Sequence, residues 1–159
     1  MERLIGAEPL EAAAFAPFGE VIEAVGTPRV INAGRCRRYH DLARVDLAGE
    51  DARAALSIFR SEAVTLPYRF DLVERHPLGS QAFVPLGPDP FLVIVAPEGP
   101  GRPRAFLTRP GQGVNLGRGV WHGVLTPLDR PADFAVVDRE GAGTNLEEHR
   151  YDTPWTVTG

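Results

Sequence analysis

Residues 81–96 read QAFVPLGPDPFLVIVA. This stretch contains two apolar runs, Gln81–Leu86 and Phe91–Ala96, separated by the turn-forming residues Gly87-Pro88-Asp89-Pro90, which predicts two strands and a turn between them. Runs of the same kind, most of them bounded by glycine or proline, recur at intervals of roughly 8 to 14 residues, a spacing typical of a β-sandwich, barrel or jelly roll. The other expected strands are Gly19–Ala24, Ala55–Arg60, Pro67–Glu74, Ala105–Thr108, Gly113–Leu116, Gly123–Leu128 and Asp133–Asp138.

Helices are expected to be few. The Ala-rich segment Glu8–Phe15 predicts a short helix, and Leu42–Leu56 has room for a helical turn or two around Arg44–Leu47. The segment Pro97–Pro103 is rich in glycine and proline and predicts a long hairpin loop. The 17 glycines and 15 prolines are spread over the whole chain, so the sequence predicts one domain over residues 1–159 rather than two joined by a linker.

The composition excludes several functions. The chain has 159 residues, 43% of them hydrophobic, and a net charge of -4, which fits a globular protein and gives no electrostatic reason to expect nucleic acid. All 17 basic residues are arginine, which excludes a Schiff-base lysine and the lysine of a phosphate-binding loop. Cys36 is the single cysteine, so there is no intrachain disulfide. No apolar run is long enough for a signal peptide or a membrane span, and we expect a cytoplasmic protein.

The first segment with chemical potential runs from Glu74 to Gln81, where an expected strand ends in a turn. Because side chains alternate along a strand, Glu74 and His76 should point to one face and Arg75 to the other. A carboxylate beside an imidazole suits either a metal site or a pair of proton-transfer groups. The alternative is a solvated glutamate and a histidine that only caps a turn.

The second segment, Gly111–His122, is glycine-rich and ends in a histidine. It lacks the third glycine of a dinucleotide-binding loop and has no helical pattern after it, so no nucleotide cofactor is expected. The glycines fit tight turns between strands. Taken alone, His122 would more often be structural than a ligand, but together with Glu74 and His76 it suggests a composite site.

The two segments resemble degenerate versions of the two cupin motifs, G-x5-H-x-H-x3,4-E-x6-G and G-x5-P-x-G-x2-H-x3-N. In this comparison Glu74 and His76 take the places of the paired histidines, Gln81 that of the glutamate, and His122 that of the second motif's histidine. The resemblance implies a mainly β, cupin-like jelly-roll barrel with a few short helices. It also implies that Glu74, His76, Gln81 and His122 would hold a divalent metal, with lower affinity than three imidazoles and a carboxylate.

A second resemblance covers nearly the whole chain and is carried by segments 15–22, 31–43, 58–60, 74–83, 91–96, 111–115, 119–122 and 133–139. In these segments the sequence resembles the ureidoglycolate lyase family of allantoin degradation. That resemblance implies a homodimer, a reported association with nickel, and conversion of (S)-ureidoglycolate to glyoxylate and urea for nitrogen use.

This substrate carries a carboxylate, a hydroxyl and a ureido nitrogen on one carbon, so its cleavage needs a base, an acid and a cation. We expect Glu74, His76 and His122 to serve the proton transfers, unless a metal takes them as ligands. In the absence of lysine, an arginine should bind the carboxylate. The remaining candidates for substrate binding are Arg38, Arg60, Arg69, Phe83, Asn115 and Trp121, each of which has a purely structural alternative.

Two other functions remain open at this stage. One is a metal-dependent amidohydrolase that attacks the ureido carbonyl with water and releases ammonia. The other is a cupin-like domain that binds a ligand without catalysis. His149, within the polar run Glu147–Arg150, is interpreted as part of a solvated charge cluster.

Overall fold

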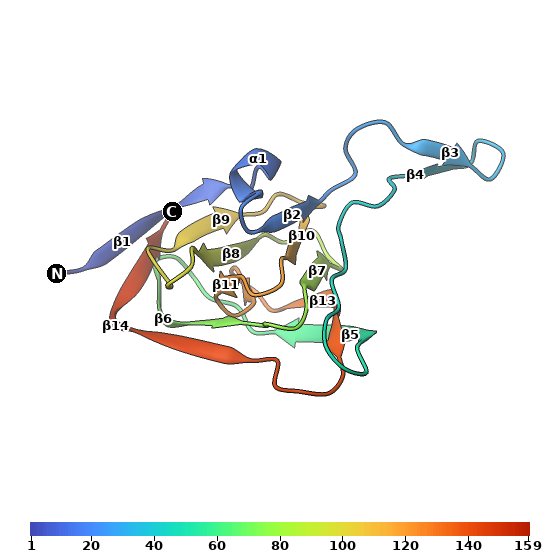
Figure 1. Cartoon of the computed structure of the whole chain (residues 1–159). Coiled ribbons are helices and arrows are strands. Elements are labelled where there is room, and N and C mark those ends of the chain that lie inside the picture. Colours follow the sequence, from blue (N-terminus) through green and yellow to red (C-terminus); the bar gives the residue numbers. More distant parts are fainter.

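The computed structural model describes residues 1–159 and is built almost entirely of strands (Figure 1). One helix of four residues, α1 (Ala12–Phe15), lies between β1 and β2. No helix has the length and apolar character that crossing a membrane would require. The expected mainly β, cupin-like barrel is confirmed.

Six strands form a closed barrel, and the ring closes because β11 pairs with both β6 and β8. Its interior is filled by apolar side chains from all six strands, among them Val73, Ile94, Trp121, Tyr151 and Val157. A short additional strand, β12 (Thr126–Pro127), pairs with β8 outside the ring. The strands of the ring, in spatial order, are β6 (Tyr68–Arg75), β14 (Glu147–Thr158), β1 (Arg3–Pro9), β9 (Arg104–Leu107), β8 (Phe91–Ala96) and β11 (Trp121–His122).

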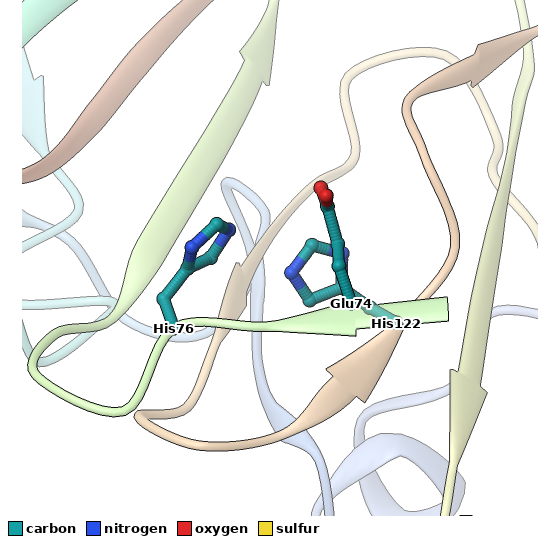
Figure 2. A group of neighbouring side chains, drawn as sticks. All are labelled: Glu74, His76 and His122. Atoms are coloured by element: carbon teal, nitrogen blue, oxygen red, sulfur yellow. The ribbon is translucent and has the colours of Figure 1, made fainter. Parts of the chain in front are cut away.

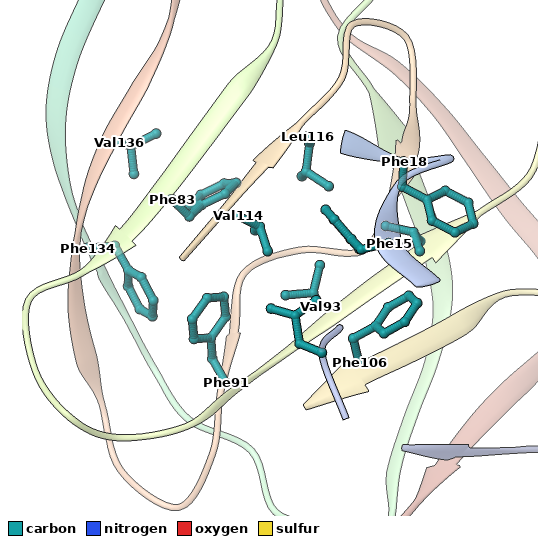
Figure 3. Packing of buried hydrophobic residues seen from close by; sticks show 12 residues of the cluster. Phe15, Phe18, Phe83, Phe91, Val93, Phe106, Val114, Leu116, Phe134 and Val136 are labelled. Carbon is teal, nitrogen blue, oxygen red and sulfur yellow. The ribbon is translucent and has the colours of Figure 1, made fainter. Parts of the chain in front are cut away.

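A second sheet of five strands packs against the outside of this barrel and creates a second core (Figure 3). Phe91, Val93 and Val95 contribute to this core, whereas the alternate residues of β8 point into the barrel. All six residues of β8 are therefore buried, which explains why this strand is an unbroken apolar run. The five strands, in spatial order, are β2 (Gly19–Ile22), β10 (Gly113–Leu116), β7 (Gln81–Pro85), β13 (Ala132–Glu140) and β5 (Arg53–Ser61).

A hairpin of two short strands, β3 (Arg29–Ile31) and β4 (Cys36–Arg38), projects from the body of the molecule (Figure 1). These strands pair only with each other. All their residues are exposed except the half-buried Cys36. Because an isolated two-stranded hairpin is marginally stable in water, this arm is a candidate for contact with another molecule.

Several local predictions were wrong. The helix expected over Glu8–Phe15 begins only at Ala12, because residues up to Pro9 belong to β1. No helical turn forms within Leu42–Leu56: carbonyl oxygens of this segment accept hydrogen bonds from the Asn115 amide and the Arg139 guanidinium. The strand expected over Gly123–Leu128 is reduced to β12, and strands β1, β3, β4, β11 and β14 were not predicted. The long turn after β8 does connect a hairpin, β8–β9.

Candidate active site

The end of β6 and the short strand β11 bring Glu74, His76 and His122 together (Figure 2). One potential ligand atom from each of the three side chains lies within 4.8 Å of the others. The two imidazole rings are 5.2 Å apart between centroids. His122 is directly opposite Glu74 in the antiparallel pairing of β11 with β6, so these two side chains share a face of the sheet.

The local sequence explains this arrangement. The strand ends at Arg75, just before His76 and Pro77, and the amide of Gly119 donates a hydrogen bond to the His76 carbonyl oxygen at 3.0 Å. Gly119 has a φ of 74°, a conformation that glycine adopts without strain. Arg75 points to the opposite side, as the alternation predicts: it pairs with Glu98 and Glu147 and lies over the Trp121 ring.

Both histidines have their ring orientation and proton position fixed by a backbone carbonyl. The Nδ1 of His76 lies 2.9 Å from the Asn145 oxygen, and the Nδ1 of His122 lies 2.9 Å from the Gly123 oxygen. Because a carbonyl can only accept, each Nδ1 carries a hydrogen, and a neutral ring held in this way has its lone pair on Nε2. Both Nε2 atoms are buried without a partner.

Burial also sets the charge of the site. Burial lowers the pKa of His122 to about 4. The hydrogen bond to Gly123 raises this pKa and the nearby His76 lowers it, but burial has the largest effect. His122 is therefore neutral at pH 7. Burial raises the pKa of Glu74; the neighbouring His76 opposes this shift and Glu148 adds to it. The raised pKa makes Glu74 a better proton acceptor than an exposed glutamate.

Glu74 and His122 line a cavity of about 390 Å³ that has room for a small molecule, whereas His76 is not among its lining residues. Phe83 forms part of its wall and packs edge-on against Phe59, with ring centroids 6.0 Å apart. Arg60 reaches the same cavity while its Nε and Nη2 bind Asp133 at 2.9 and 3.0 Å. The lining residues are Phe59, Arg60, Ser61, Glu74, Gln81, Phe83, His122, Val124 and Leu125.

This donor set fits a divalent transition metal. Two imidazoles and a carboxylate lie close together, and each imidazole is held through Nδ1 by a carbonyl, as is usual for metal-binding histidines. The Oε1 of Gln81, which lines the same cavity, is also buried without a partner. Unpaired buried polar atoms are costly, so these atoms are candidates for binding a cation or a ligand.

Four predicted binding residues lie outside this cavity within one chain. Arg38 belongs to the projecting β3–β4 hairpin, and Arg69 lies at the other end of β6 from Glu74. Trp121 precedes His122 on the same strand and therefore points the opposite way, into the barrel. Asn115 is on the far face of its sheet, where its amide binds Glu20 and the Arg44 carbonyl.

Other residues around the site were missed or misinterpreted. Asn145 was missed because nothing in its loop sequence points to a role: its carbonyl holds His76, and its side chain accepts a hydrogen bond from the Leu78 amide at 2.7 Å. Asp138, which binds Gln81, was counted only as a strand residue. His149 is not simply solvated, because its half-buried ring packs against Trp121 and Tyr151.

The fold is a small closed barrel, and the cluster of two imidazoles and a carboxylate lies on its outer side. This combination defines a cupin-like protein that acts on a small molecule. The family model described as ureidoglycolate lyase matches residues 2–158, and the chain belongs to this family. A relative from Rhodobacter capsulatus named ureidoglycolate lyase is 58% identical, with 100% of each chain covered. Relatives of the same name from Chelativorans sp. and Rhizobium meliloti, the latter named ureidoglycolate lyase 2, are both 56% identical; the matches cover 98% and 94% of this chain and 96% and 94% of theirs.

Proposed function

We propose that this protein is a ureidoglycolate lyase, which converts (S)-ureidoglycolate to glyoxylate and urea in allantoin degradation. The observation that carries the proposal is the cluster of Glu74, His76 and His122, of which Glu74 and His122 line a cavity of small-molecule size. Membership of the family and the names of the relatives support the choice of substrate. The unpaired Cys36 fits a reducing compartment, and we propose a cytoplasmic location.

The reaction is an elimination in which water does not take part. The hydroxyl O–H bond and the C–N bond to the ureido group break, while a C=O bond and a new N–H bond on urea form. The hydroxyl loses one proton and the leaving nitrogen gains one proton, so the reaction balances. Both atoms are attached to the same carbon, so a single carrier can serve both transfers.

Glu74 is the residue to which we assign this proton transfer. Its pKa is raised by burial, whereas His122, with a pKa of about 4, is a weak base. The Nδ1–H groups of both histidines are occupied by backbone carbonyls. A carboxylate has two oxygens, so Glu74 can bind a cation through one and still exchange a proton through the other.

We also propose that Glu74, His76, His122 and Gln81 bind a divalent metal, nickel by resemblance to the family. When bound, such an ion would act as a Lewis acid on oxygen atoms of the substrate. The unpaired Nε2 atoms and the unpaired Gln81 Oε1 support this assignment. The side chains of Phe83 and Leu125 give the same cavity an apolar wall.

Arg60 is the arginine we assign to the substrate carboxylate, because it is the one arginine among the residues that line the cavity and Asp133 binds only its Nε and Nη2. Replacing Arg60 by alanine should raise KM by about 10-fold or more, since hydrogen bonds between charged groups contribute about 1.5–3 kcal/mol. Arg130→Ala is a matched control because Arg130 forms a similar exposed pair with Asp89. Steady-state kinetics in which both variants give the same KM would contradict the assignment.

The homodimer implied by the family needs an exposed apolar surface, and this chain has one. Leu56, Ile58 and Val84 are 76%, 60% and 37% exposed on the outer face of β5 and β7. Pairing through β13 makes Ile58, Ala135 and Val84 neighbours, so the exposed side chains form one apolar patch. The β3–β4 hairpin adds unpaired arginines to a molecule of net charge -4. We propose that a second copy covers this patch and contacts the hairpin, in a two-fold symmetric dimer.

An Ile58→Glu change should convert this dimer to monomers, because it places a charge in the centre of the apolar patch. Sedimentation velocity at micromolar concentration measures the change directly. Leu4→Glu is the control, since Leu4 is 49% exposed on β1, which is not part of the patch. A dimer that survives Ile58→Glu but not Leu4→Glu would locate the interface elsewhere.

A product assay tests the proposed function. Purified protein is incubated with (S)-ureidoglycolate, and urea, glyoxylate and ammonia are measured in parallel, before and after chelation and after addition of nickel. We expect equal amounts of urea and glyoxylate without ammonia, and loss of activity on chelation that nickel restores. Ammonia in place of urea would instead establish an amidohydrolase, and binding without turnover would establish a ligand-binding domain.

A further inference from the structure

A carboxylate that is not itself in the cluster lies directly behind Gln81. Gln81 begins β7, and Asp138 lies on the neighbouring strand β13. The Gln81 Nε2 donates a hydrogen bond to the Asp138 Oδ2 at 3.2 Å. Gln81 is only 7% exposed, and its other polar atom, Oε1, is buried without a partner.

The chemistry of the two side chains fixes the direction of the amide. An ionised carboxylate can only accept hydrogen bonds, whereas the amide of glutamine has one donating end and one accepting end. Asp138 therefore selects the NH₂ end, which leaves Oε1 for the cavity that Gln81 shares with Glu74 and His122. We propose that Asp138 is a positioning residue that keeps the Gln81 carbonyl oxygen directed into the active site.

This pairing also gives a reason for the departure from the cupin motif at Gln81. A glutamate at this position would place two carboxylates in contact across β7 and β13, and like charges at such a distance cannot both ionise freely. With glutamine at this position, the negative charge that the motif usually has at the site is carried instead by Asp138 on the neighbouring strand β13. The charge-assisted bond polarises the amide and makes its oxygen a stronger acceptor or ligand.

The first readout uses metal-free protein and does not depend on the proposed function. In ¹⁵N-labelled protein, the side-chain NH₂ of Gln81 gives two proton resonances, and the hydrogen-bonded one should lie further downfield than in an exposed glutamine. Asp138→Leu removes the acceptor and should move that resonance back to the position found in exposed glutamines. Asp89→Asn, which removes a surface carboxylate that pairs with Arg130, should leave the Gln81 resonances unchanged. Resonances that are the same in wild type and Asp138→Leu would overturn the proposal.

The second readout, nickel affinity by calorimetry, rests on the proposed metal site. Asp138→Leu should weaken binding by about 10- to 100-fold, the usual effect of losing a group that orients a ligand. The exchange Gln81→Glu with Asp138→Asn reverses the polarity of the pair, because an asparagine NH₂ can then donate to a glutamate. That double variant should regain wild-type affinity or better. If it binds as weakly as Asp138→Leu, Asp138 has only a structural role and the proposal fails.

The two measurements test the metal assignment and the positioning role of Asp138 separately. If wild-type protein binds no nickel, the metal assignment is wrong, and the NMR comparison in metal-free protein still decides the orientation of Gln81. If nickel binds and the Gln81 resonances do not respond to Asp138→Leu, the positioning role is wrong and the metal assignment stands. Thermal melting of each variant identifies those that have lost the fold.

Discussion

Replacing Glu74 by glutamine should lower kcat for urea release by about 10²- to 10⁴-fold, the usual contribution of a positioned proton-transfer group. Glutamine has nearly the shape of glutamate, so the cavity wall and the pairing of β6 with β11 should be preserved. It cannot, however, accept the hydroxyl proton and pass it to the leaving nitrogen. KM should change much less than kcat, because the carboxylate of the substrate is assigned to Arg60.

Glu148→Gln provides the matched control for this experiment. Glu148 is directly opposite Glu74 in the pairing of β14 with β6, and it is exposed, outside the residues that line the cavity. Its loss removes the same charge from almost the same place and should leave kcat close to that of wild type. If kcat falls equally in the two variants, the local negative charge is what matters, and Glu74 is not the group that transfers the proton.

The fold was easiest to predict where turn residues bound a buried strand. The bounds of β8 and β10 agree with those predicted, because glycine or proline stands at or near their ends and both strands are buried throughout. The longest strand, β14, was missed because it is rich in charged residues and contains Pro154. That proline lies in the irregular stretch between Arg150 and Trp155, where proline is tolerated in a sheet. What makes β14 a strand is its pairing with β6 and β1, and a local pattern cannot show that pairing.

The part of the site that could be predicted from the sequence is the part that depends on side chains alternating between the two faces of one strand. Glu74 and His76 share a face for this reason, and the same rule shows why Trp121 and His122 cannot both line the cavity. The sequence was uninformative about partners from distant segments. The carbonyl of Asn145 and the carboxylate of Asp138 act on residues 69 and 57 positions earlier. Neither contact leaves a local signature, because each depends on how the strands are packed.

Replacing His76 by alanine should weaken nickel binding by more than about 100-fold, because removal of a ligand exceeds the 10- to 100-fold effect of losing a group that only orients one. His76 is half-buried at the end of β6, so its removal disturbs little packing. His149→Ala is the control: His149 is also half-buried, but its ring packs against Trp121 and Tyr151 on the barrel side. Calorimetric titration of the metal-free proteins with nickel should give wild-type affinity for His149→Ala and severe loss for His76→Ala. Unchanged affinity in His76→Ala would remove this histidine from the metal site and leave its lone pair available for proton transfer.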